Sequence, residues 1–233
     1  MLSSSQLALA VAHADVASQM GFSSSARYFQ TGEVDGKWWK EVRNLDQVLA
    51  PLTLSKRAFV IVKGDVRADV RLPKGGWFLI YGDLYSSVEM NSHSELIVAG
   101  NVMEGATILG NQFLNVFVGG DFAGRLCSLQ SCKLWVERNM NGSILTGYPS
   151  THIRVGGDCD ATIAPNDKAS LLYLIVDGFM SYESLKATAA VRYTAFDASI
   201  GVSDRPAGIH PKNASNLMKH HRSYNRWVIR SKR

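Results

Sequence analysis

The stretch IVKGDV, residues 61–66, decides the fold because its pattern returns at a nearly constant interval. Most copies have two apolar or aromatic residues, a variable residue, a glycine, an Asp or Asn, and an apolar residue. The other copies are LIYGDL at 79–84, IVAGNV at 97–102, FVGGDF at 117–122, WVERNM at 135–140 and RVGGDC at 154–159. Aligned on the Asp or Asn and continued to Gly178, they are separated by 18, 18, 20, 18, 19 and 20 residues. A fixed period near twenty residues predicts a solenoid.

Apolar residues around each copy alternate with period two, which indicates strands rather than helices. In the first copy the alternate positions are Val60, Val62, Gly64, Val66, Ala68, Val70 and Leu72. One repeat therefore supplies two or three short strands, and stacking repeats at about 4.8 Å gives a continuous core. The sequence predicts a mainly β chain, a single-stranded parallel β-helix of about seven coils of 18–20 residues.

The glycine and the Asp or Asn of each repeat have structural explanations. We expect the glycine to face inward at a bend, where a side chain would crowd the core or strain the backbone. The following Asp or Asn lies on the corner, where it can bond neighbouring backbone amides. Two charged residues break the pattern: Arg138 takes the glycine position of the fifth coil, and Glu104 takes a small position in the third. We expect a bulge or solvent exposure there, with a functional pocket as the alternative.

The flanks divide the chain into three parts. We expect an N-terminal helical cap over residues 1–57, the solenoid over 58–180, and a C-terminal flank over 181–233 with a basic helical tail. Capping signals place a first helix between Ser5 and Gly21. Its apolar positions include Leu7, Val11 and Met20.

One outward-facing column is apolar in five coils. The candidate interaction face comprises Ile61, Leu79, Tyr81, Ile97, Phe117 and Trp135. Because monomers rarely expose patches of this size, we expect something to cover it. Inside the chain the candidate is a second helix over 37–50 that ends before Pro51. Its apolar side holds Trp38, Val42, Leu45 and Leu49. The alternative is another chain.

The net charge of +5 is concentrated in the C-terminal tail, which has seven Lys or Arg and no acid between His210 and Arg233. The rest of the chain holds 18 Lys or Arg against 20 Asp or Glu. One interpretation is a solvated helix that caps the last coil. The other is contact with nucleic acid, anionic lipid or an acidic protein. The candidate contacts are Lys212, Lys219, Arg222, Arg226 and Arg230.

Motifs for catalysis, metals or cofactors are missing from the sequence. It contains no nucleophile elbow, P-loop or dinucleotide fingerprint, and its Asp column does not follow the calcium-binding nonapeptide. The cysteines Cys127, Cys132 and Cys159 lack metal-ligand spacing and indicate reduced core thiols of a cytoplasmic protein. No apolar run reaches the roughly 18 residues of a membrane-spanning helix. We expect neither an enzyme nor a bound cofactor.

The IVKGDV, LIYGDL and IVAGNV repeats, over roughly residues 58–180, resemble the short-coil β-helices of the bactofilins, which are bacterial polymer-forming proteins. They also resemble the β-helix domain at the end of the glutamate synthase large subunit. The resemblance implies the fold and, for the bactofilins, end-to-end polymerisation. This chain departs from the bactofilin plan in its long flanks, because capping elements block open-ended stacking.

The leading hypothesis is a non-enzymatic bacterial β-solenoid that binds a protein partner through a lateral face, with Tyr81, Phe117 and Trp135 as anchors. It would act as an assembly scaffold or as an inhibitor such as an immunity protein. A bactofilin-like polymer and a nucleic-acid-associated protein that binds through residues 210–233 are the alternatives.

Overall fold

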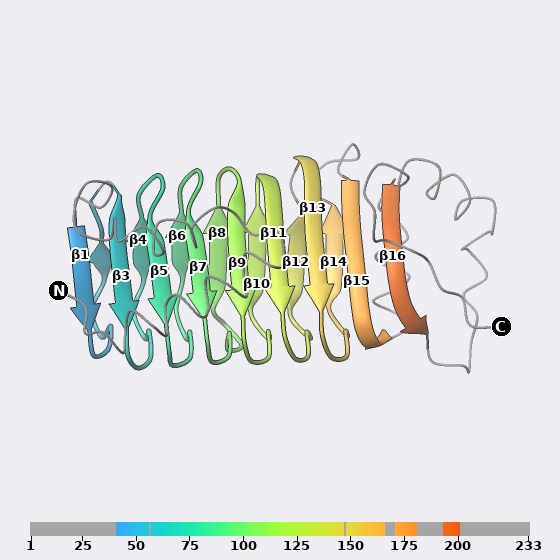
Figure 1. Ribbon diagram of the computed structural model, residues 1–233, viewed down its shortest axis with the longest axis horizontal. Coiled ribbons are helices and arrows are strands. Elements are labelled where there is room, and N and C mark those ends of the chain that lie inside the picture. The colour runs from blue at the N-terminus through green and yellow to red at the C-terminus, as the bar shows by residue number, and fades with distance from the viewer. Residues whose placement is uncertain (1–40, 56, 147, 166–170, 181–192, 201–233) are drawn as a thin grey trace, which may run out of the picture.

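The computed structural model describes residues 41–55, 57–146, 148–165, 171–180 and 193–200. Within these ranges the chain winds into a parallel β-solenoid of about seven turns (Figure 1). Seven turns place one strand in each of two long parallel sheets, and sheet A continues with β15 and β16. This architecture confirms the fold predicted from the repeat.

The first sheet, sheet A, has nine strands in ladder order. They are β1 (Glu41–Leu45), β3 (Ala58–Val62), β5 (Trp77–Ile80), β7 (Glu95–Val98), β9 (Leu114–Val118), β11 (Gln130–Val136), β13 (Tyr148–Val155), β15 (Leu171–Met180) and β16 (Tyr193–Ile200). The second, sheet B, has seven strands. They are β2 (Leu52–Thr53), β4 (Val70–Leu72), β6 (Val88–Met90), β8 (Thr107–Gly110), β10 (Arg125–Ser128), β12 (Ser143–Thr146) and β14 (Thr162–Pro165).

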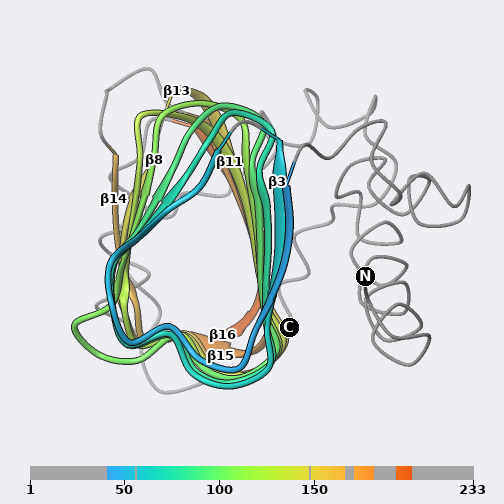
Figure 2. The same ribbon diagram turned by 90° about the vertical axis from the view of Figure 1, so that its left-hand side faces the viewer.

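A single bridge residue on each turn links the two sheets after the Gly-Asp bend. These residues stack in one parallel column: Val48, Val66, Leu84, Val102, Phe122, Met140 and Cys159. Viewed along the solenoid, the turns superimpose as rings, with β3 and β11 on one side and β8 and β14 opposite (Figure 2). The inward side chains of both sheets and the bridge column form one buried cluster from Val48 to Val176.

The helix predicted over 37–50 is wrong in its described part. Residues 41–45 are strand β1, which pairs with β3, and Val48 bridges to Val66. Leu49, expected on the buried side of the helix, is 69% exposed. The apolar spacing fits both a helix and a coil, and pairing decides between them. A coil over 41–53 pairs with the backbone N–H and C=O groups at the edge of β3, which a helix would leave unpaired.

The ladder extends beyond the limits expected for the solenoid. It begins with β1 before residue 58, and sheet A continues past residue 180 to β16. The helix expected between Ser5 and Gly21 and the basic tail after His210 lie outside the described residues.

The corner Asp and Asn residues form a continuous hydrogen-bonded ladder, as predicted. Asp65 Oδ1 accepts from the Asp83 backbone N–H at 3.1 Å, and Asp83 Oδ1 accepts from the Asn101 N–H at 2.7 Å. The pattern continues from coil to coil up to the bond between Asn139 Oδ1 and the Asp158 N–H, at 2.9 Å. Each side chain therefore replaces a backbone acceptor where the chain bends.

This ladder explains the glycines better than the core does. A Cβ on Gly82 would lie 2.6 Å from Asp65 Oδ1 and 2.5 Å from the carbonyl carbon of Gly64, both in the preceding coil. None of the bend glycines has a positive φ; among glycines only Gly75 and Gly105 do in the described residues. The glycine therefore makes room for the neighbouring carboxylate or amide, and backbone strain is not its cause.

Both charged interruptions point to solvent. Glu104 is exposed in a turn closed by a hydrogen bond from the Ala106 N–H to the Met103 oxygen, at 3.1 Å. Gly105, with φ of 87°, completes this turn, and Ala106 takes the buried small position. Arg138 is also exposed. The expectation of a bulge or solvent exposure is confirmed, although nothing in the structure explains why this coil lacks its glycine.

Candidate functional site

The register of sheet A brings five of the predicted face residues into one column. Ile61, Leu79, Ile97, Phe117 and Trp135 occupy equivalent positions on β3, β5, β7, β9 and β11. Tyr81 follows β5 two positions after Leu79. We call the outer surface of these five strands the lateral face.

The lateral face is buried within the single chain. The exposed fraction is 0% for Ile61 and Leu79, and 3% for Ile97 and Phe117. Trp135 and Tyr81 are half-buried, and burial raises the pKa of the Tyr81 hydroxyl. A free sheet face would leave such side chains in contact with water. The lateral face is therefore not an open docking surface in this structure.

A carboxylate is also buried on the lateral face. Glu95 of β7 is 7% exposed and accepts hydrogen bonds from the Trp77 indole N–H and from the Asn115 side-chain amide, the latter at 3.2 Å. Phe59 stacks on Trp77 with ring centroids 5.3 Å apart. These donors supply hydrogen bonds to the Glu95 oxygens, which would otherwise be costly to bury.

Charged groups replace apolar ones toward the C-terminal end of the same face. The Arg154 guanidinium of β13 lies over the Trp135 ring, 4.4 Å from its centroid. It also pairs with Asp177 of β15 at 2.9 Å, and the two side chains are 40% and 43% exposed. Burial thus decreases along the column of aligned residues from Ile61 of β3 to Arg154 of β13.

The turns that lead from sheet B back to sheet A contain the strained backbone of the described chain. Arg57, Gly75, His93 and Phe113 occupy the same position on four successive coils and have φ of 54°, 68°, 59° and 46°. Glycine adopts this left-handed conformation freely, whereas a bulky side chain there is an outlier. Phe113 packs against His93 with ring centroids 5.1 Å apart. The turns form a row along the upper edge of Figure 1.

Exposed apolar side chains gather around this row of turns. Phe113 is 50% exposed, Leu109 of β8 is 40% exposed and Leu129 is 57% exposed. Leu129 lies on the next coil, where its N–H bonds the Gly110 oxygen at 3.0 Å. Coil spacing in a parallel ladder is about 4.8 Å, so Leu129 lies beside Asn111, two positions along the chain from Leu109 and from Phe113. We call Leu109, Phe113 and Leu129 the corner patch.

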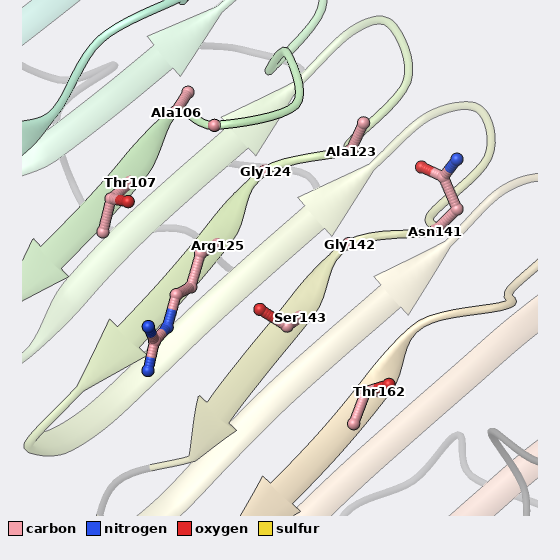
Figure 3. Close-up of a pocket in the computed structure, with 10 residues that line it drawn as sticks. Ala106, Thr107, Ala123, Gly124, Arg125, Asn141, Gly142, Ser143 and Thr162 are labelled. Atoms are coloured by element: carbon pink, nitrogen blue, oxygen red, sulfur yellow. The ribbon is translucent and has the colours of Figure 1, made fainter.

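A shallow groove crosses the coils on the sheet B side. It is lined by Gly105, Ala106, Thr107, Ala123, Gly124, Arg125, Asn141, Gly142, Ser143 and Thr162. Figure 3 shows Thr107, Arg125, Ser143 and Thr162 on the neighbouring strands β8, β10, β12 and β14. The glycines have a packing explanation, because a Cβ on Gly124 would lie 2.7 Å from the Ala106 oxygen. Small side chains demanded by coil stacking therefore produce this groove.

The described residues contain no cluster of three or more His, Cys, Asp or Glu that could hold a metal ion. Nor does any helix in this part of the chain have the length and apolar content to span a membrane. The predicted tail contacts, from Lys212 to Arg230, lie outside the described residues. All three cysteines are free thiols, and burial raises the pKa of Cys132 to about 12 and of Cys159 to about 11.

Comparisons with protein-family models, with curated proteins and with solved structures find no match for this chain. The resemblance to the bactofilins is thus supported at the level of a parallel β-solenoid alone.

The corner patch is not among the surfaces predicted from the sequence. Phe113 and Leu129 lie outside the repeated motif, in the turns between sheet B and sheet A. One signal was present: the third and fourth coils carry His93 and Phe113 where the second carries Gly75. An aromatic residue aligned with a turn glycine indicates a strained position.

Proposed function

We propose that this protein is a non-enzymatic interaction protein whose solenoid presents the corner patch to a protein partner. The observation that carries the proposal is Phe113, an aromatic side chain that is half exposed and held at φ 46°. The left-handed conformation costs a residue with a Cβ about 1–2 kcal/mol. Packing on His93 offsets only part of that cost, since an aromatic pair contributes about 0.5–1.5 kcal/mol.

The corner patch has the composition of a small protein-binding hot spot. Aromatic side chains on a rigid frame bury a large area at low entropic cost. The frame is rigid here because the turn that holds Phe113 connects β8, which pairs with β10, to β9, which pairs with β7. Strain at an exposed residue is typical of functional positions, where it is retained despite its cost.

Protein binding is the kind of function that the sequence predicted, but the proposed binding surface is the corner patch and not the lateral face. Of the residues expected to anchor a partner on the lateral face, Phe117 is buried and Tyr81 and Trp135 are half-buried, whereas Leu109, Phe113 and Leu129 are exposed. The roles of scaffold and inhibitor are both compatible with such a surface. A cytoplasmic location is part of the proposal, and the three free thiols support it because reducing compartments keep cysteines unpaired.

The proposal is tested by site-specific photo-crosslinking in the native cells. A photo-crosslinking amino acid is placed at Leu129, inside the corner patch, and at Glu137, which is exposed on a different part of the coil. We expect a defined protein adduct from position 129 and none of that mass from position 137. Identical adducts from both positions, or none from 129, would contradict the proposal.

The same experiment separates the alternatives. An adduct between two copies of this chain would favour the polymer-forming alternative, which sedimentation of the purified protein would then verify. The nucleic-acid alternative stays a prediction about the tail. Salt-dependent DNA or RNA binding that disappears in a chain ending at Ala207 would support it.

A further inference from the structure

We propose that the partner of the corner patch is a protein with an acidic side chain next to its apolar contacts, and that this carboxylate binds the Arg125 guanidinium on the outer face of sheet B. The inference rests on the proposed function, because it names the chemistry of the partner that the corner patch binds. In the ladder, Arg125 of β10 lies between Thr107 of β8 and Ser143 of β12 (Figure 3).

Arg125 is a cation without a carboxylate partner among the described residues. The charged residues in the strands of sheet B are Arg71, Glu89 and Arg125. Arg71 pairs with Glu89 on the neighbouring coil, with 3.0 Å between Nε and Oε2. The positions beside Arg125 hold uncharged Thr107 and Ser143 instead. Arg125 is exposed and forms no ion pair with any described Asp or Glu, so its guanidinium is available to an acidic group from another molecule.

The two residues beside Arg125 complete a set of hydrogen-bond donors for a carboxylate. Thr107 and Ser143 point to the same side of the sheet as Arg125, one coil away at about 4.8 Å. A guanidinium presents its N–H groups in a planar fork that matches the two oxygens of a carboxylate, and each hydroxyl can donate one further hydrogen bond. Gly105 and Ala123 line the same shallow groove, so a carboxylate can approach the guanidinium without meeting a large side chain.

The corner patch reaches Arg125 along the strands. Cys127 lies two residues after Arg125 on β10 and therefore points to the same outer side, about 7 Å further along the strand. Leu109, a member of the corner patch, pairs in register with Cys127, and Leu145 of β12 follows on the other side. Arg125 thus borders a continuous apolar surface. A partner segment with an acidic side chain beside an apolar one can contact both.

A single available cation favours a protein carboxylate over a polyanion. Nucleic acids and anionic membranes bind surfaces on which several Lys or Arg are clustered. On the outer face of sheet B the second cation, Arg71, is neutralised by Glu89, and exposed Asp69 directly before β4 adds a negative charge. Arginine and aromatic side chains are instead enriched together in protein-binding hot spots, and Phe113 supplies the aromatic ring here.

The test measures how the crosslinking yield from position 129 in the native cells depends on the charge at position 125. Arg125→Glu places a negative charge opposite the carboxylate of the partner, and Arg125→Gln removes the charge but keeps a polar side chain. The matched control is Arg138→Glu, because Arg138 is exposed in the bend between sheet A and sheet B and forms no ion pair with the described acidic residues. We expect a loss of the partner adduct of about tenfold or more in Arg125→Glu, a smaller loss in Arg125→Gln and none in Arg138→Glu.

The outcomes separate this inference from the proposed function. No protein adduct from position 129 in the wild type overturns both. An adduct that persists undiminished in Arg125→Glu, folded as judged by its melting temperature, overturns the acidic partner and leaves the corner patch as the binding surface. If Arg125→Glu does not fold, an undiminished adduct in Arg125→Gln has the same meaning. Equal losses in Arg125→Glu and Arg138→Glu also overturn the inference, because they would show a dependence on net charge alone.

An exchange of charges tests the contact itself. Mass spectrometry of the wild-type adduct gives the attached peptide of the partner, which we expect to contain Asp or Glu. Replacing these acidic residues one at a time by Arg should restore the adduct with Arg125→Glu in at least one case. An attached peptide without an acidic residue, restoration by none of the replacements, or an adduct between two copies of this chain overturns the proposal.

Discussion

At Gly82 the backbone of one coil touches the carboxylate of the coil before it. A Cβ at this position would crowd Asp65 Oδ1, which accepts from the Asp83 N–H, so the glycine and the Asp of the repeat pack against each other across two coils. Asp46 occupies the equivalent glycine position in the first described coil, with Gln47 at the Asp position. The Gly-Asp pair of the repeat is therefore absent from the coil that no described coil precedes.

Replacing Gly82 by Ala should destabilise the fold. Its Cβ would lie within 2.6 Å of Asp65 Oδ1 and of the Gly64 backbone, and overpacking of this kind costs about 1–3 kcal/mol. The matched control is Arg138→Ala, at the same coil position but already bearing a Cβ and exposed, which should change stability by less than about 0.5 kcal/mol. Urea unfolding of both variants measures the difference in stability. Equal midpoints would contradict the explanation that the glycine is required by packing against the preceding coil.

Asp65 predicts a defined pH dependence. The hydrogen bond from the Asp83 N–H and then the Arg67 side chain hold the pKa of Asp65 below its usual value. A carboxyl with a lowered folded-state pKa stabilises the protein above its unfolded pKa and loses that contribution as the pH falls through the folded value. The stability difference between the wild type and Asp65→Asn should therefore be larger at neutral pH than at pH near 3. Melting temperatures at both pH values test this, and a difference independent of pH would refute it.

Among the elements, the coil over residues 41–53 shows how pairing overrides local pattern. Leu45, Val48 and Leu52 are spaced three and four residues apart, as on a helix, yet they also precede Val62, Val66 and Val70 by 17 or 18 residues. The spacing of 17 or 18 residues reflects pairing between successive coils. The edge of β3 offers backbone hydrogen-bond partners to the segment that precedes it.

Two adjacent substitutions distinguish the coil from the helix. Val48→Asp buries a charge at a core position that is 4% exposed and should cost several kcal/mol. Leu49→Asp, at 69% exposure, should change stability by no more than about 0.5 kcal/mol. A helix packed through Leu49 requires the opposite order. Chemical denaturation of the two variants decides between the structures.

The predictable and unpredictable parts of the structure have different physical causes. The period, the inward alternation and the Asp ladder repeat in every coil, so six imperfect copies in the sequence define them together. The sequence repeat marks the column of Ile97 as outward-facing but carries no information about its burial, which the structure shows. The left-handed backbone at Phe113 lies in a turn outside the repeated motif, and the residue at that turn position differs from coil to coil: Arg57, Gly75, His93 and Phe113.

At the scale of the whole molecule, the solenoid separates two faces with different roles. The lateral face of sheet A is buried from Ile61 to Phe117. The turn edge carries exposed apolar groups on a strained backbone. A rigid ladder that buries one apolar surface and displays another is suited to a binding protein.

The measurement that tests this account most directly is the crosslinking yield from position 129 in the Phe113→Asn chain, compared with Leu49→Ser. Asn accepts the left-handed backbone but lacks the ring, so the melting temperature should stay within a few degrees of the wild type. Leu49 is an exposed apolar residue outside the corner patch, at 69% against 50% for Phe113. We predict that Phe113→Asn loses the partner adduct while Leu49→Ser retains it. An adduct that persists undiminished in the folded Phe113→Asn chain would contradict the assignment of the corner patch as the binding surface.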